Sequence, residues 1–395
     1  MTAQTKQKAC ISCTTAKRRC NKTRPFCRRC ADKGLDCRYP APVKRAAAAR
    51  SSPSEGSADI PGHVYYINAH VSSLSASAPP SKLWFMIPDT WNIENSWVRA
   101  PPIPISVYRT FVRRVQHWLL EWVHEGHCPF IHRQLYADGF FPSFMQDAFS
   151  AISIHQSCND RNQDMIGRII QDKADSLIKS EGIETGDSNL MPMPAPVLNT
   201  SQHLARVQAL LVYQILRLFD KGVWQQTHAE EAMPILLSWC QQMWDSAILD
   251  SITTSQTVGS LSKDAGQQGS LGIGDPAPRL WRLWILSESI RRTWFVAMAT
   301  ISAYRTMKDG WCECHGGIMF TVRKGLWLAT SSSQWETLCR TEDPLFLPCL
   351  GNRAMLESCN PTEVDEFCFS CFALIWGPEW AEGWSAAHGA RTLAV

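Results

Sequence analysis

Six cysteines near the start of the chain repeat one spacing twice, and this repeat constrains the fold more than any other feature. They are Cys10, Cys13, Cys20, Cys27, Cys30 and Cys37, separated by 2, 6, 6, 2 and 6 residues. Each Cys-x2-Cys pair can hold a metal ion from adjacent turns of backbone, and the third cysteine returns after a short helix. Tetrahedral thiolate ligation is typical of zinc. Two separate four-thiolate sites need eight sulfurs, so the six present predict two zinc ions that share two bridging thiolates.

The charge of the chain is divided unevenly between this segment and the rest. Residues 1–50 carry a net charge of +12, and the other residues carry a net charge of −9. A basic N-terminal segment followed by an acidic remainder of the chain is typical of a nucleic-acid-binding module joined to a second domain. The alternatives are a zinc module that binds protein or lipid, and an iron–sulfur site. The density of Lys and Arg argues against them, and iron–sulfur cysteine spacings differ.

Residues 8–40 resemble the fungal binuclear zinc-cluster transcription factors of filamentous ascomycetes. Lys17 lies four residues after Cys13, Pro25 lies between the two repeats, and the segment closes with the residues Gly34-Leu35-Asp36-Cys37-Arg38-Tyr39-Pro40. In that family the first and fourth cysteines bridge the two ions. The resemblance therefore implies one zinc ion held by Cys10, Cys13, Cys20 and Cys27, and a second held by Cys10, Cys27, Cys30 and Cys37. It also implies two short helices around the cluster.

The resemblance implies double-stranded DNA as the partner and a G/C-rich, CGG-like half-site as the target. Lys17 would donate to guanine in the major groove. The other basic side chains would mainly bind phosphate; they are Arg18, Arg19, Lys22, Arg24, Arg28 and Arg29. Thr14 and Asn21 stand where many members carry Arg and Asp, so the half-site stays open. Arg18 replaces a residue that is usually apolar, and a phosphate contact and a second base contact are equally open for it.

Several classes of protein are disfavoured by composition. The longest charge-free apolar runs are about 12 residues, short of a membrane span. No apolar signal segment follows the first residues, so we expect a reducing compartment, and the DNA-binding head indicates the nucleus. No nucleophile elbow, phosphate-binding glycine loop or metalloprotease helix is present, so we expect no enzyme.

Composition divides the chain into three parts: a zinc-cluster domain at 1–45, a flexible Pro/Ser-rich linker at 46–102 and a regulatory domain at 103–395. The linker assignment rests on eight prolines and six charged residues in 51–105. No leucine heptad follows the cysteines, so a homodimer is possible but unsupported. Within the regulatory domain we expect loops at 182–200 and 251–278, because these stretches are rich in Pro, Gly and Ser.

Apolar residues in the regulatory domain recur at helical spacing, which predicts a mostly α-helical fold. The clearest stripe consists of Leu280, Leu283, Ser287, Ile290, Trp294, Ala297, Ile301 and Tyr304. A core helix is the favoured interpretation of this stripe, and a dimer seam is the alternative. Near the C-terminus, acidic residues interleave with aromatic ones from Glu363 to Trp384. That mixture is found in activation segments that dock on coactivators or the transcription machinery. A last core helix is favoured, because the aromatic residues share one face.

The regulatory domain also resembles the helical regulatory region of fungal regulators of this class. The matching motifs are Ser289-Ile290-Arg291-Arg292-Thr293-Trp294, Gly310-Trp311, Gly316-Gly317, Phe320-Thr321-Val322-Arg323 and Gly325-Leu326-Trp327. The resemblance favours a pathway-specific transcription regulator, such as one for a secondary-metabolite gene cluster. The alternatives are a regulator whose helical body senses a small molecule and gates DNA binding, and an enzyme domain fused to a DNA-tethering module.

Two further groups of His and Cys are candidate sites. Cys312, Cys314 and His315 could form a metal site with Cys339 or His388, but the spacing suits zinc poorly. The second group comprises His124, His127, Cys128 and His132, and we interpret it as ordinary loop and core residues.

Overall fold

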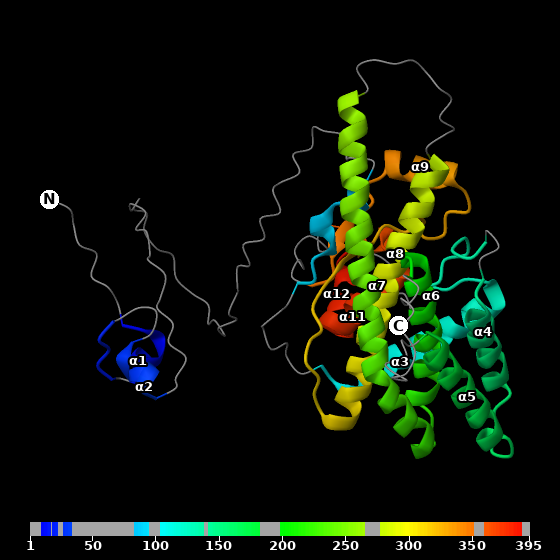
Figure 1. Cartoon of the computed structure of the whole chain (residues 1–395), viewed down its shortest axis with the longest axis horizontal. Helices are drawn as coiled ribbons and strands as arrows, with labels where there is room; N and C mark the ends of the chain where they lie inside the picture. The colour runs from blue at the N-terminus through cyan, green and yellow to red at the C-terminus, as the bar shows by residue number, and fades with distance from the viewer. Residues whose placement is uncertain are drawn as a thin grey trace, which may run out of the picture. The chain divides into compact units, whose positions relative to one another are not determined.

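A computed structural model describes residues 9–16, 18–22, 27–33, 83–94, 103–137, 141–181, 198–264, 277–350 and 359–388. The chain divides into two compact units, Met1–Asn68 and Ala69–Val395. The first unit holds two short helices, α1 (Ile11–Thr15) and α2 (Arg28–Asp32), drawn in blue in Figure 1. The second unit, called the body below, is built almost entirely of helices.

The body consists of helices that surround two buried ones. The α-helices in its described part are α3 (Ile105–Glu125), α4 (Ser143–Gln156), α5 (Gln163–Glu181), α6 (Thr200–Leu218), α7 (Val223–Asp264), α8 (Ala277–Asp309), α9 (Ser332–Thr341), α11 (Glu366–Trp376) and α12 (Pro378–Ala387). Short 3-10 helices are η1 (Trp84–Met86), η2 (Pro88–Trp91) and η3 (Pro361–Glu363). Strands β1 (Met319–Thr321) and β2 (Phe346–Pro348) pair antiparallel, with Phe320 opposite Leu347. The predicted mostly α-helical body is confirmed. Among the described helices, none has the length and apolarity to cross a bilayer.

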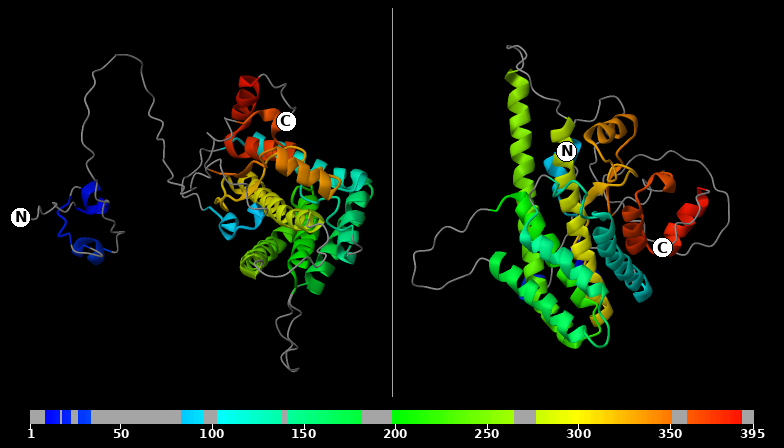
Figure 2. Two further views of the ribbon diagram at one scale, coloured as in Figure 1. Left: turned by 90° about the horizontal axis from the view of Figure 1, so that it is seen from above. Right: turned by 90° about the vertical axis from the view of Figure 1, so that its right-hand side faces the viewer.

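Helices α6 and α8 form the centre of the body (Figure 2). Every residue from 204 to 218 in α6 and from 287 to 301 in α8 is buried. A helix enclosed on all sides shows no single apolar face, so polar residues on it must find partners inside the protein. The predicted core role of the stripe on α8 is confirmed, since Ile290, Ala297 and Ile301 are at most 1% exposed.

The predicted loop at 251–278 is wrong at both ends. Helix α7 continues to Asp264, and α8 already begins at Ala277. The side chains of Ser251 and Thr253 donate to the carbonyl oxygens of Ile248 and Leu249, so residues that suggest a loop by composition bond to their own helix. Once a helix is formed, each added residue gains a backbone hydrogen bond without a new nucleation cost. Residues 182–197 of the predicted loop at 182–200 lie outside the described residues. The last residue of that predicted loop is helical, because α6 begins at Thr200.

The predicted linker at 46–102 is wrong for residues 83–94, which we call the strap. Phe85, Met86 and Trp91 of the strap are at most 4% exposed. The strap packs against α7 and α8 (light blue in Figure 2). Its end pairs with Gly317 through two backbone hydrogen bonds of 2.7 and 2.8 Å to Glu94. The linker prediction rests on the composition of the whole segment 51–105, in which the short apolar run at 83–87 is a small part. The packed body therefore includes residues that precede 103. The remainder of the predicted linker, other than 83–94, lies outside the described residues.

A buried ion network joins three distant segments of the body. The Nε atom of Arg292 donates to Glu288 at 3.0 Å, and its Nη2 atom lies 3.4 Å from Asp365. The backbone N–H of Thr321 also donates to Glu288, at 3.0 Å. Burial alone would lower the pKa of Arg292, but the carboxylates of Asp365 and Glu288 raise it above its usual value. The guanidinium carbon of Arg292 also lies 4.2 Å from the ring centroid of Trp327. This buried cation is thus the point where three of the sequence motifs meet, those at 289–294, 320–323 and 325–327.

The C-terminal aromatic residues lie in the core, as favoured from their periodicity. Phe367, Phe372 and Trp384 are at most 4% exposed. Successive rings contact one another from Phe372 to Trp384, with centroid distances between 4.6 and 5.3 Å. The acidic residues Glu363, Glu366, Glu379 and Glu382 are exposed around them.

Candidate metal centre and nucleic-acid interface

The two Cys-x2-Cys pairs lie in equivalent positions on the two short helices. Cys10 immediately precedes α1, and Cys13 lies within it. Cys27 immediately precedes α2, and Cys30 lies within it. Residues three apart at the start of a helix lie on the same face, so each pair presents two thiols toward the same point. The repeated sequence unit is therefore also a repeated local structure.

The four thiols of these pairs come together in one buried cluster. Their sulfur atoms lie within 4.8 Å of one another, and all four residues are at most 1% exposed. The Sγ atom of Cys27 lies 3.7 Å from both Cys10 and Cys13. Cys30 lies 3.8 Å from Cys10 and 4.0 Å from Cys13. None of the described cysteines is in a disulfide.

These distances fit zinc. Zn–S bonds of about 2.3 Å at tetrahedral angles give sulfur–sulfur edges of about 3.8 Å. The four distances between the two pairs are 3.7 to 4.0 Å, and all the donors are sulfur, which is the ligand chemistry that structural zinc sites use. Hydrogen bonding from the backbone N–H of Cys30 lowers the pKa of the Cys27 thiol, which favours the thiolate that a metal binds. The N-terminal unit therefore contains a zinc-binding site.

Of the other two predicted ligands, the structure describes one. Cys20 is half-buried, and its sulfur lies 3.8 Å from that of Cys10. Cys37 lies outside the described residues. Among the described residues, Cys10 has sulfur contacts with three other cysteines, which suits a bridging ligand.

Basic side chains lie around the cluster. Arg18, Arg19, Lys22 and Arg28 are exposed, as expected of phosphate contacts. A hollow on this unit is lined by Arg19, Asn21, Arg28, Arg29 and Lys33. Lys33 was missed by sequence reasoning, although its position four residues after Arg29 would place it beside that residue on a helix. Lys17 and Arg24 lie outside the described residues.

Arg29 differs from the other predicted phosphate contacts. Its Nη1 atom donates to the sulfur of Cys13 at 3.8 Å, and its side chain is half-buried. A cation against a thiolate offsets negative charge at the cluster. Asn21 accepts a hydrogen bond from the backbone N–H of Arg28 at 3.0 Å, so it joins the two halves of the unit.

No second cluster of metal-ligating side chains occurs in the part of the body that the structure describes. Cys314 is exposed, and Cys312 lies beside Ser302. His132 is buried against the rings of Trp281, Trp284 and Trp327. The interpretation of His132 and Cys128 as core residues is confirmed by exposures of 3% and 1%.

Comparison with known proteins agrees with this geometry. Residues 8–46 match the Fungal Zn(2)-Cys(6) binuclear cluster domain. Transcription factor gsfR2 of Penicillium aethiopicum is 27% identical to the chain over 376 residues, which cover 86% of this chain and 85% of the relative. No solved structure matches the chain. The likeness to gsfR2 therefore extends through the body as well as the cysteine array.

Proposed function

Since this chain is a DNA-binding transcription regulator of the fungal Zn(2)-Cys(6) cluster class, we propose that its N-terminal unit reads a G/C-rich, CGG-like half-site through a binuclear zinc cluster. The observation that supports this proposal is the buried cluster of four cysteine thiols with exposed cationic side chains around it. A unit this small has almost no apolar core, so metal binding provides most of its folding free energy. The same metal-dependent fold fixes the positions of the side chains that face DNA.

The proposed ligand sets share Cys10 and Cys27 as bridges between two zinc ions. Cys13 and Cys20 complete one set, and Cys30 and Cys37 complete the other. The distances of 3.7 Å from Cys27 to Cys10 and 3.8 Å from Cys10 to Cys20 support the first set. The distance of 3.8 Å from Cys10 to Cys30 supports the second set.

The proposed DNA interface separates base reading from phosphate binding. Lys17 donates to guanine, and Arg18, Arg19, Lys22, Arg24 and Arg28 bind phosphate. We add Lys33 to the phosphate contacts, because it lines the same hollow as Arg19 and Arg28. Arg29 lines this hollow too, and its contact with Cys13 gives it a second role at the metal cluster.

The test is zinc content and DNA binding of the full chain with Cys13→Ala. We expect loss of zinc and of binding to CGG-containing duplex, with the helical circular dichroism of the body unchanged. Cys158→Ala is the matched control, because Cys158 is a partly exposed body cysteine far along the sequence from the cluster. Unchanged DNA affinity of Cys13→Ala, at equal salt, would refute the proposal.

We further propose that the regulator acts in the nucleus on a secondary-metabolite gene cluster, with coactivators or the transcription machinery as protein partners. Its resemblance to pathway-specific regulators and its likeness to gsfR2 support this context. Imaging of a fluorescent fusion, together with transcript profiling of a deletion strain, tests it. Homodimerisation stays a prediction.

A further inference from the structure

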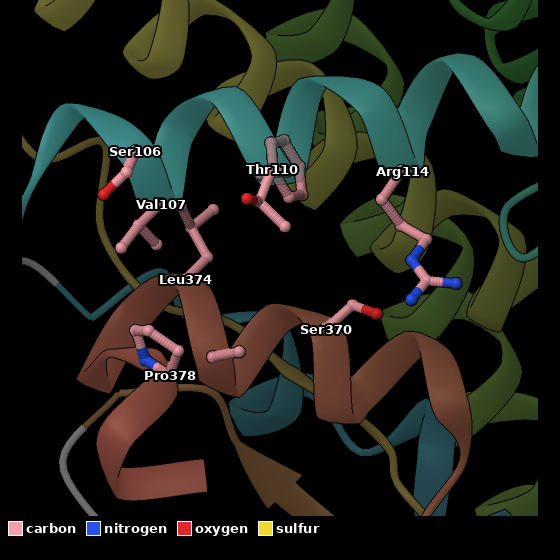
Figure 3. Close-up of a pocket in the computed structure, with 9 residues that line it drawn as sticks. Ser106, Val107, Thr110, Arg114, Ser370, Leu374 and Pro378 are labelled. Carbon is pink, nitrogen blue, oxygen red and sulfur yellow. The ribbon is translucent and has the colours of Figure 1, made fainter. Parts of the chain in front are cut away.

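A groove of about 210 Å³ lies between α3 and the C-terminal helices α11 and α12 (Figure 3). Its floor is apolar: Val107 and Phe111 come from α3, and Ala373 and Leu374 come from α11, with exposures between 4% and 9%. Pro378 closes one end beside Val107 and Leu374. This volume accommodates a ligand of roughly a dozen non-hydrogen atoms.

A polar stripe runs along the α3 side of the same groove. Ser106, Thr110 and Arg114 are spaced four residues apart, so they share one face of α3. Figure 3 shows Arg114 at the end opposite Pro378, near Ser370 of α11. The hydroxyl groups of Ser106 and Thr110 therefore line one side of the groove, and the cation of Arg114 lies at the end opposite Pro378.

Glu366 is one partner of the cation of this groove, and this ion pair is at the surface. Nη1 of Arg114 lies 2.9 Å from Oε1 of Glu366, whose side chain is 67% exposed. Exposed ion pairs of this kind contribute about 0–1 kcal/mol. A ligand carboxylate can therefore replace Glu366 on Arg114 at little cost, while an apolar ligand body gains burial against Leu374 and Pro378.

We propose that this groove binds a small carboxylic acid with an apolar body, with its carboxylate on Arg114 and its apolar part between Val107, Leu374 and Pro378. The charge of Arg114 and the apolar end of the groove together select this class over neutral or fully polar molecules. The site belongs to the body, so it goes beyond the proposed DNA interface and does not depend on it. A regulator with such a site responds to an organic acid through its helical body.

The test uses the full-length chain and two probes of equal shape, 2-naphthoic acid and the neutral 2-naphthamide, in isothermal titration calorimetry. We expect the acid to bind about tenfold more tightly than the amide, because hydrogen bonds to charged groups are the stronger ones. Arg114→Gln should remove this preference. Glu366→Gln should strengthen binding of the acid a few-fold, since it removes the competing carboxylate.

Arg113→Gln is the matched control, because Arg113 is an exposed arginine of the same helix that does not line the groove. It should leave both affinities unchanged. Both variants keep the basic N-terminal unit, so a loss of preference in Arg114→Gln but not in Arg113→Gln assigns acid binding to the groove rather than to that unit. Thr110→Trp, checked for an unchanged melting temperature, should fill the groove and abolish binding of both probes. Absence of acid binding at millimolar concentration, or equal acid affinity in the wild type and Arg114→Gln, would overturn the proposal.

Discussion

The guanidinium carbon of Arg291 lies 3.8 Å from the ring centroid of Trp91, which joins α8 to the strap. The ring of Phe346 lies 5.0 Å from the same carbon. Nη2 of Arg291 donates to the carbonyl oxygen of Phe85 at 2.8 Å and to the hydroxyl of Thr90 at 3.1 Å. Burial lowers the pKa of Arg291 to about 9. Its Nε and Nη1 atoms have no hydrogen-bond partner within the described part of the chain, so the aromatic rings add to the stabilisation that the two hydrogen bonds of Nη2 provide.

Trp91→Ala should destabilise the body by about 3–5 kcal/mol, because it opens a large cavity and removes the ring over Arg291. Urea unfolding monitored by circular dichroism measures this change. Ile87→Ala is the matched control within the strap, since Ile87 is 44% exposed. It should change the free energy of unfolding by no more than about 0.5 kcal/mol. Equal effects of the two substitutions would mean that the strap does not contribute through Trp91.

Glu288→Gln should cost about 3–5 kcal/mol of stability, because it leaves the buried cation of Arg292 with less counter-charge. Glu288 is fully buried, whereas Glu366 pairs with Arg114 at the surface. Glu366→Gln should therefore cost less than about 1 kcal/mol. The same denaturation experiment compares them, and a small effect for Glu288→Gln would contradict a structural role for the network.

His132 should make the body less stable in acid. Burial and then the charge of Arg292 lower its pKa to about 3, whereas an unfolded histidine titrates near 6.5. Between these values the unfolded chain binds a proton that the folded chain does not, so stability falls as the pH falls from about 6.5 to 3. The slope from this group is at most about 1.4 kcal/mol per pH unit. The stability difference between wild type and His132→Phe should change with this slope. The exposed His117, replaced by Gln, is the control, and a pH-independent difference for His132→Phe would contradict the assignment.

Lys17→Ala should reduce discrimination between CGG-containing and unrelated duplexes by about 1–3 kcal/mol. Lys22→Ala should instead weaken binding to all sequences alike and lower the salt slope by about one. Competition binding at several salt concentrations measures both quantities. If Lys17→Ala weakens all duplexes equally, Lys17 is a phosphate contact rather than a base reader.

The metal cluster was predictable because its geometry is local. The spacing of Cys10, Cys13, Cys27 and Cys30 places each pair of thiols on one face of a short helix, and the shared metal chemistry of the four thiols predicts that the two pairs meet. The contact between Arg29 and Cys13 was not predictable, because it depends on how the two halves pack.

The body was predictable as a set of helices but not in its details. Periodicity identified α8 as a core helix. The partners of Arg292 lie at Thr321 and Asp365, and no local pattern links these positions. The strap was concealed for a related reason. Its apolar side chains pack against a surface formed by α7 and α8, and the composition of a segment does not predict packing against a distant surface.

The buried network has a consequence for shortened versions of this protein. Asp365 supplies part of the counter-charge of Arg292 and also begins α11 by accepting the backbone N–H of Phe367 at 2.8 Å. A premature stop codon anywhere upstream of this residue would therefore leave an arginine in the centre of the domain without half of its neutralising groups. Such a product would be a substrate for cellular protein quality control rather than a regulator with a missing tail, so nonsense alleles that remove Asp365 should behave as complete losses of function.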